Sequence, residues 1–206
     1  MSNPQTSEAL AEEKLRRAII NGQLPTDEFL SQRNLAEMVG AAVITVRAAL
    51  RSLESDRLIE NVPRWGVRIP RESEATIRDR YYVRQILEVE AVRKVAANPQ
   101  PQQIELLRRL AAKCDHQVIH HPDDIETFAQ AHFDLHHAIA ECSGSQLLVE
   151  VLDRAFYKTM LRFNTRRDHL REAMKVLHGD LVEELISGDT DRAVSAITNH
   201  IALGLK

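Results

Sequence analysis

The sequence predicts a mainly α-helical protein, in which an N-terminal winged helix-turn-helix precedes an antiparallel bundle of about six helices. Residues 35–55 read as two short helices joined by a turn, and residues 58–69 read as two short β-prone runs. From residue 77 onward the chain shows helical periodicity alone. Its 206 residues suffice for two domains with separate cores. We expect a tail at 1–7, a first domain at 8–70, a hinge at 71–76 and a second domain at 77–206.

Three amphipathic helices are expected in the first domain. The apolar stripe of the first helix consists of Ala11, Leu15, Ala18 and Ile19. The stripe of the second consists of Leu35, Ala36 and Val39, and that of the third of Val46, Ala49, Leu50 and Leu53. Gly22 and Gly40 end the first two helices, because glycine tolerates the left-handed backbone of a helix exit.

The exposed face of the third helix carries Arg47 and Arg51, one turn apart. Because the turn before this helix is short, the helix is free to enter a major groove, where arginine meets phosphates and guanine edges. The alternative is an ordinary helical hairpin with two solvated arginines.

A wing after the third helix favours DNA binding over that alternative. Strands are predicted at 58–62 and 67–69, and the residues between them have turn chemistry. The segment 61–71 carries basic charges alone, from Arg64, Arg68 and Arg71, which suits contact with a phosphate backbone.

This first domain resembles the GntR family of bacterial transcription regulators. The matching positions are Ile20, Gly22, Leu24, Leu30, Leu35, Ala36, Gly40, Val46, Arg47, Ala49, Leu50, Leu53, Leu58, Ile59 and Gly66. The resemblance implies DNA contacts from Arg33 and Arg47, and it places Trp65 where such proteins often have a minor-groove residue; the alternative for Trp65 is packing on its own domain. We predict operator contacts from Arg33, Thr45, Arg47, Arg51, Arg64, Trp65 and Gly66.

The chain departs from the family pattern at the start of the third helix. Ala42 and Val43 replace the family's Ser-Arg, Thr45 replaces its Pro, and Ala48 replaces its Glu. Loss of the Ser removes an N-cap, at a cost of about 0.5–2 kcal/mol. Loss of the Arg removes a contact whose bidentate form discriminates bases by about 1–3 kcal/mol. Either the operator differs from the family's usual one, or DNA binding is weakened.

Composition sets wider bounds on the class of protein. The apolar content is 44%, and no apolar run approaches the roughly 20 residues that span a bilayer. The polar N-terminus lacks a signal pattern, and two cysteines, Cys114 and Cys142, fit a reducing compartment, so we expect a cytoplasmic protein. The net charge of −3 argues weakly against DNA binding, although the third helix and wing are locally basic.

Six helices are expected in the second domain, at residues 74–97, 100–119, 123–142, 145–165, 168–187 and 190–204. This part of the chain holds all nine histidines. His132 and His136 have the i, i+4 spacing that forms a bidentate clip for a transition metal, although satisfied core histidines are commoner. His178 and His200 each lie within an apolar helical stripe, with Met174 and Leu181 among the neighbours of His178. An unpartnered imidazole there costs free energy, and a shared metal would satisfy all four histidines.

The second domain also resembles the C-terminal ligand-binding domain of the FadR branch of the GntR family. The matches include the run His132–His136, then Ile139 and Gly144, and later His178, Gly188, Asp189, Ala193, His200 and Ile201. Members commonly hold a divalent metal through one Asp and three His, and here His132 stands at the Asp position. The resemblance implies a metal site of His132, His136, His178 and His200, a homodimer, and a small carboxylate effector near Arg84 and Arg162. Four neutral imidazoles favour Zn²⁺ or Ni²⁺ and leave the ion's charge uncompensated, which would attract an anion.

Three functions therefore compete. The leading hypothesis is a homodimeric transcription regulator, acting as a repressor, whose affinity for double-stranded operator DNA responds to an organic acid at the metal. The second is a metalloenzyme with a four-histidine centre, against which the absence of a recognisable nucleophile or base motif speaks. The third is a regulator whose metal is purely structural.

Overall fold

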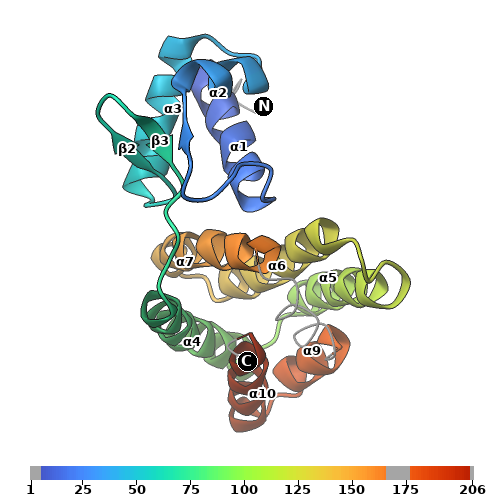
Figure 1. Cartoon of the computed structure of the whole chain (residues 1–206). Helices are drawn as coiled ribbons and strands as arrows, with labels where there is room; N and C mark the ends of the chain where they lie inside the picture. Colours follow the sequence, from blue (N-terminus) through green and yellow to red (C-terminus); the bar gives the residue numbers. More distant parts are fainter. Residues whose placement is uncertain (1–5, 166–176, 205–206) are drawn as a thin grey trace. The chain divides into compact units, whose positions relative to one another are not determined.

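A computed structural model describes residues 6–165 and 177–204, and its contacts divide the chain into two units, Met1–Ser73 and Glu74–Lys206. The first unit contains three helices and a small antiparallel sheet (Figure 1). Its elements are α1 (Ser7–Ile20), β1 (Phe29–Leu30), α2 (Gln32–Val39), α3 (Val43–Ser55), β2 (Glu60–Val62) and β3 (Gly66–Arg68). The predicted winged helix-turn-helix is confirmed.

The three helices of the first unit enclose one apolar core. The predicted stripes of all three are buried, and Leu53 and Val46 are fully enclosed. Arg16 of α1 donates to Asp56, the residue that ends α3, across 2.6 Å. Gly40 ends α2 with φ +67°, the left-handed exit predicted from the sequence. Packing on α1 and α2 therefore fixes the buried face of α3 and leaves its other face exposed.

Strand β1 was not predicted from the sequence. It pairs with β3, placing Phe29 opposite Arg68 and Leu30 opposite Val67, so that β3 is the central strand of the order β1-β3-β2. Two residues are too few to show the alternation by which a strand is recognised, and tertiary pairing defines this one.

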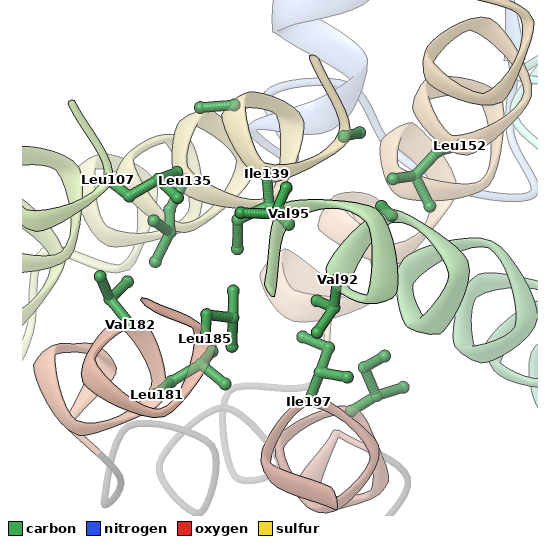
Figure 2. Close-up of a cluster of buried hydrophobic side chains, with 14 of the residues drawn as sticks. Val92, Val95, Leu107, Leu135, Ile139, Leu152, Leu181, Val182, Leu185 and Ile197 are labelled. Atoms are coloured by element: carbon green, nitrogen blue, oxygen red, sulfur yellow. The ribbon is translucent and has the colours of Figure 1, made fainter. Parts of the chain in front are cut away.

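Six helices are described in the second unit, where their buried side chains form one core (Figure 2). They are α4 (Glu74–Ala97), α5 (Pro101–His120), α6 (Ile125–Cys142), α7 (Gln146–Thr165), α9 (His178–Ile186) and α10 (Thr190–Leu203). Val92 and Val95 of α4 meet Ile139 of α6 and Ile197 of α10 in this core. None of the described helices is long and apolar enough to cross a membrane.

One predicted helix starts later than expected. The helix around His178 begins at that residue, because Leu177 has an extended backbone with ψ 133°, and the predicted start at residue 168 lies outside the described residues. Asp115 of α5 accepts the backbone N–H groups of His178 and Gly179 and so fixes the first turn. Met174 lies outside the described residues, whereas Leu181, Val182 and Leu185 of the predicted stripe are buried.

Two glycine substitutions should separate backbone strain from steric clash in the winged unit. A Cβ on Gly66, at φ +108°, would lie 2.5 Å from the backbone oxygen of Leu30, whereas a Cβ on Gly40 would meet nothing within 4 Å. We expect Gly40→Ala to lower the free energy of unfolding by about 1–2 kcal/mol and Gly66→Ala by about 3 kcal/mol or more. Urea unfolding followed by the fluorescence of Trp65, the chain's single tryptophan, measures both. Equal losses would contradict the clash with β1.

Candidate functional site

The predicted DNA contacts lie on α2, α3 and the wing. Arg47 and Arg51 are exposed on α3, and Arg47 Nε donates to Gln32 Oε1 of α2 across 3.2 Å. A groove of about 500 Å³ between α3 and the wing is lined by both arginines and by Arg64 and Trp65. Arg33 is exposed on α2, where it pairs with Glu37. This surface offers a convex helix flanked by cationic side chains.

The tip of the wing is shaped by two residues with positive φ, Arg64 at 71° and Gly66 at 108°. The ring of Trp65 lies 5.4 Å from the ring of Phe29, yet the residue remains 69% exposed. Packing of Trp65 on its own domain therefore covers a minor part of its side chain.

Thr45, another predicted DNA contact, is half-buried in the first turn of α3.

Ion pairs reduce the positive charge expected of segment 61–71. Arg68 lies 2.6 Å from Glu60 on the neighbouring strand, and Arg71 lies 3.6 Å from Asp27. The chain brings these acids in from outside the segment, which a count over 61–71 could not show. Arg64, by contrast, has no ion pair with any described residue, so it is the wing's available cation.

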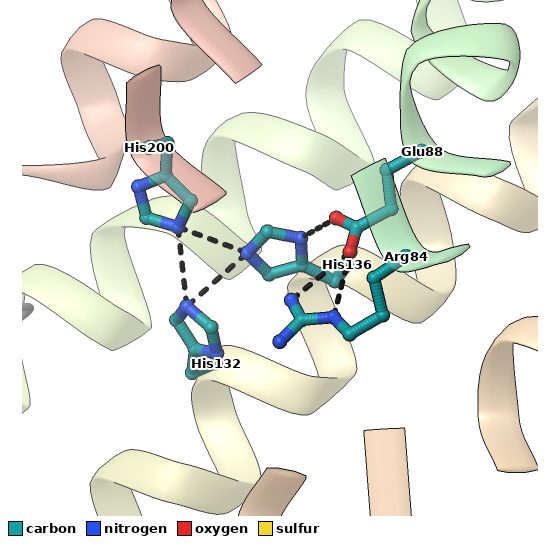
Figure 3. Close-up of polar contacts among 5 residues, drawn as sticks. All are labelled: Arg84, Glu88, His132, His136 and His200. Atoms are coloured by element: carbon teal, nitrogen blue, oxygen red, sulfur yellow. Dashed lines mark hydrogen bonds and ion pairs between the residues drawn. The ribbon is translucent and has the colours of Figure 1, made fainter. Parts of the chain in front are cut away.

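Three histidines converge inside the helical unit (Figure 3). His132 and His136 come from α6 and His200 comes from α10. The Nε2 atom of His136 lies 3.2 Å from that of His132 and 3.1 Å from that of His200, and the last two are 3.2 Å apart. Three nitrogens bound to one ion at about 2.0–2.1 Å, with tetrahedral to octahedral angles, are roughly 2.8–3.4 Å apart. This histidine trio therefore has the geometry of a facial set of metal ligands.

Protonation supports a cation at the trio. Burial, followed by the neighbouring histidines, lowers the pKa of His132 and of His200 well below its usual value, so both rings are neutral at pH 7. A neutral Nε2 carries either a proton or a lone pair, so three mutual contacts cannot all be hydrogen bonds. One shared cation satisfies all three nitrogens. Neutral imidazoles suit Zn²⁺, Ni²⁺ or Co²⁺ better than Mg²⁺ or Ca²⁺.

His178 lies beside the trio without joining it. Its ring centre is 5.2 Å from that of His132 and 5.0 Å from that of His200. Nδ1 lies 3.2 Å from Asp115 Oδ1, while Nε2 is buried and has no hydrogen-bond partner among the described residues. The Nε2 atom of His178 can therefore still form a hydrogen bond or bind a ligand beside the histidine trio.

Glu88 on α4 was not predicted and is the carboxylate of this centre (Figure 3). It is 2% exposed, and its Oε2 accepts the Nδ1–H of His136 across 2.5 Å. Burial raises the pKa of Glu88, but the charge of Arg84 and the contact with His136 lower it by more, so the group is ionised. With its proton on Nδ1, His136 turns the lone pair of Nε2 toward the other two histidines.

Arg84 is held within the same network. Its Nε donates to Glu88 Oε1 across 2.9 Å, and its guanidinium stacks 3.8 Å from the ring centre of Phe156. The count of four neutral imidazoles did not include the charges around them: Glu88 and Asp115 place negative charge against two of the histidines, and Arg84 offsets part of it. The side chain of Arg162 lies outside the described residues.

Comparison with known proteins decides the family. The model of bacterial regulatory proteins of the gntR family matches residues 8–69, and the FCD domain model matches residues 79–203. The chain belongs to the GntR family. Its C-terminal part is an FCD effector-binding domain, as in the FadR-type branch.

Individual relatives of this GntR protein are distant but match along nearly the whole chain. The uncharacterized HTH-type transcriptional regulator YdhC of Bacillus subtilis (strain 168) is 22% identical over 191 residues, covering 91% of this chain and 84% of the relative. The structure of E. coli McbR/YncC matches with a TM-score of 0.83 at 21% identity, over 96% of this chain and 94% of that one. A GntR-type regulator from Rhodococcus sp. RHA1 matches with a TM-score of 0.80 at 21% identity, over 96% and 95%. These structures share the fold, and the families and relatives are transcription regulators rather than enzymes.

Sequence signals found some of the site's polar residues in this GntR protein and missed others. The helical spacing of His132 and His136 was visible, as was the apolar setting of His200. Glu88 and Asp115 were missed because a lone acid on a long helix gives no sign of which partner it meets. An acid on the buried stripe of α4, in register with Arg84, was the available signal for Glu88.

Removing the charge of Glu88 should weaken metal binding. Glu88→Gln deprives His136 of its charged acceptor, and such outer contacts typically contribute 10–100-fold to metal affinity. We expect Zn²⁺ affinity, measured by competition with a chromophoric chelator, to fall by about that factor. Glu90→Gln, an exposed change on the same helix, is the matched control. Unchanged affinity in a variant with normal circular dichroism would contradict the assigned role.

Proposed function

We propose that this GntR-family regulator is a homodimeric repressor whose operator affinity is controlled by a small organic acid bound at a divalent transition metal, Zn²⁺ or Ni²⁺. His132, His136 and His200 hold the ion, and the buried Nε2 of His178 completes the set. The observation that carries the proposal is the mutual approach of three neutral Nε2 atoms to 3.1–3.2 Å. The protein acts on DNA in the bacterial cytoplasm.

An anionic effector suits this centre on grounds of charge. Glu88 and Asp115 together offset the two charges of a divalent ion, Arg84 restores one positive charge, and the centre retains net attraction for a carboxylate. With His178 as the fourth protein ligand, a six-coordinate ion such as Ni²⁺ keeps two positions that a carboxylate can fill. Arg84, and Arg162 on α7, are the arginines proposed to face that anion.

Dimerisation is supported by an apolar patch on α4. Tyr82, Val83 and Ile86 are 67%, 42% and 53% exposed, and their spacing places Tyr82 and Ile86 one turn apart. Two copies joined through such a patch would present two α3 helices to a two-fold symmetric operator. The effector must then favour one arrangement of the winged units, and a coupling of about 1–3 kcal/mol suffices for regulation.

Arg47→Ala tests the DNA surface. Removing one guanidinium from the exposed face of α3 should weaken operator binding by about 1–3 kcal/mol, or roughly 5- to 150-fold. Electrophoretic shift of the promoter of this chain's own gene measures the loss. Arg109→Ala, which removes an exposed arginine from α5, should leave affinity unchanged. Equal behaviour of the two variants would contradict the placement of DNA on α3.

His136→Ala tests effector control. In the unaltered protein, an active acid added with Zn²⁺ or Ni²⁺ should change operator affinity at least about five-fold, and it should raise thermal stability by about 2.7 kcal/mol at a hundredfold excess over its dissociation constant. The variant should lose both responses while still binding DNA. The double variant His116→Ala/His120→Ala controls for ions on an exposed pair of histidines.

A panel of small mono-, di- and tricarboxylic acids supplies the candidates. A metal that stabilises the protein while every acid leaves operator affinity unchanged would favour the purely structural metal over effector control.

A further inference from the structure

The first turn of α3 presents two exposed aliphatic side chains. Val43 is 40% exposed and Ile44 is 67% exposed. Isolated exposed apolar residues are common on protein surfaces and by themselves indicate nothing. These two, however, lie at the leading end of the helix that carries Arg47, in the unit that belongs to a DNA-binding family.

Helical spacing places the aliphatic residues and the arginines on one face. Val43 and Ile44 precede Arg47 by four and three residues, and Arg51 follows one turn later. Val46, Ala49, Leu50 and Leu53 occupy the opposite, buried face. A duplex that lies against this face of α3 at Arg47 therefore also faces Val43 and Ile44.

Hydrogen-bonding chemistry is almost absent from this end of the helix. Ala42 forms no side-chain cap, and from residue 41 to residue 45 the side chains are apolar apart from the hydroxyl of Thr45. The contacts left to Val43 and Ile44 are apolar ones. In the major groove of B-DNA the apolar feature is the C5-methyl group of thymine, whereas guanine, adenine and cytosine edges offer hydrogen-bonding groups.

We propose that Val43 and Ile44 read thymine methyl groups in the operator half-site, beside the phosphate or guanine that Arg47 contacts. The inference rests on the operator binding proposed above and adds the chemistry of one base position. Where the family pattern places an arginine suited to guanine, this chain selects a T·A pair by burying methyl groups against aliphatic side chains.

The experiment begins with the full chain and a pool of random-sequence duplexes. Bound duplexes are selected, and each thymidine of the selected half-site is then replaced by deoxyuridine. This replacement removes the C5-methyl group of the base and nothing else. We expect one or two positions at which uracil lowers affinity about four-fold per half-site, the equivalent of one buried carbon. An operator substituted in both half-sites should lose about sixteen-fold.

Variants connect the methyl groups to the two side chains. Ile44→Ala and Val43→Ala should bind thymine and uracil operators with more nearly equal affinity, whereas Leu10→Ala, an exposed change on α1, should keep the full ratio. Val43→Arg should shift selection at the same position from thymine toward guanine. Fluorescence of Trp65 verifies that each winged unit is folded.

The outcomes separate this inference from the function on which it rests. Selected duplexes that bind equally well with uracil at every thymine, or an unchanged ratio in Ile44→Ala and Val43→Ala, would overturn the thymine contact alone. Failure to select any duplex, at low salt and with or without chelator, would overturn operator binding as well.

Discussion

The polar centre of the helical unit depends on the buried carboxylate of Glu88. An ionised group in an apolar core is costly unless charges and hydrogen bonds compensate it. Here Arg84 donates to one oxygen and His136 to the other, so α4 and α6 are joined by a satisfied network. The direction of that network fixes the tautomer, because the proton on Nδ1 leaves the opposite nitrogen of His136 with a lone pair. Without the carboxylate, the ring could present either nitrogen.

The same helix connects the histidine trio with the DNA-binding unit through the chain. Strand β3 ends at Arg68 and α4 begins at Glu74, so residues 69–73 link the wing to the helix that bears Arg84 and Glu88. A ligand that alters the contacts of those two residues acts on an element joined covalently to the wing. Regulation through this route requires that the ligand bind one arrangement of α4 better than another.

The recognition helix illustrates how a familiar scaffold acquires a different surface. Buried residues such as Val46 and Leu53 preserve the helix-turn-helix, while the first turn of α3 has apolar side chains apart from the hydroxyl of Thr45. The helix forms without a side-chain N-cap because its apolar stripe packs on α1, and tertiary packing contributes more to helix stability than a cap does. Exposed positions were therefore free to change without loss of the fold.

The sequence by itself determined the helices and the winged helix-turn-helix, because burial imposes a 3.6-residue period that survives in the order of residues. It also placed His132 and His136 on one face, since residues four apart are neighbours on any helix. Tertiary structure alone decided that β1 pairs with β3 and that Glu88 contacts His136. It also decided that α9 begins at His178, whose backbone N–H donates to Asp115. Each of these contacts joins residues at least 37 positions apart, so it depends on how helices and strands pack, and no local sequence pattern predicts it.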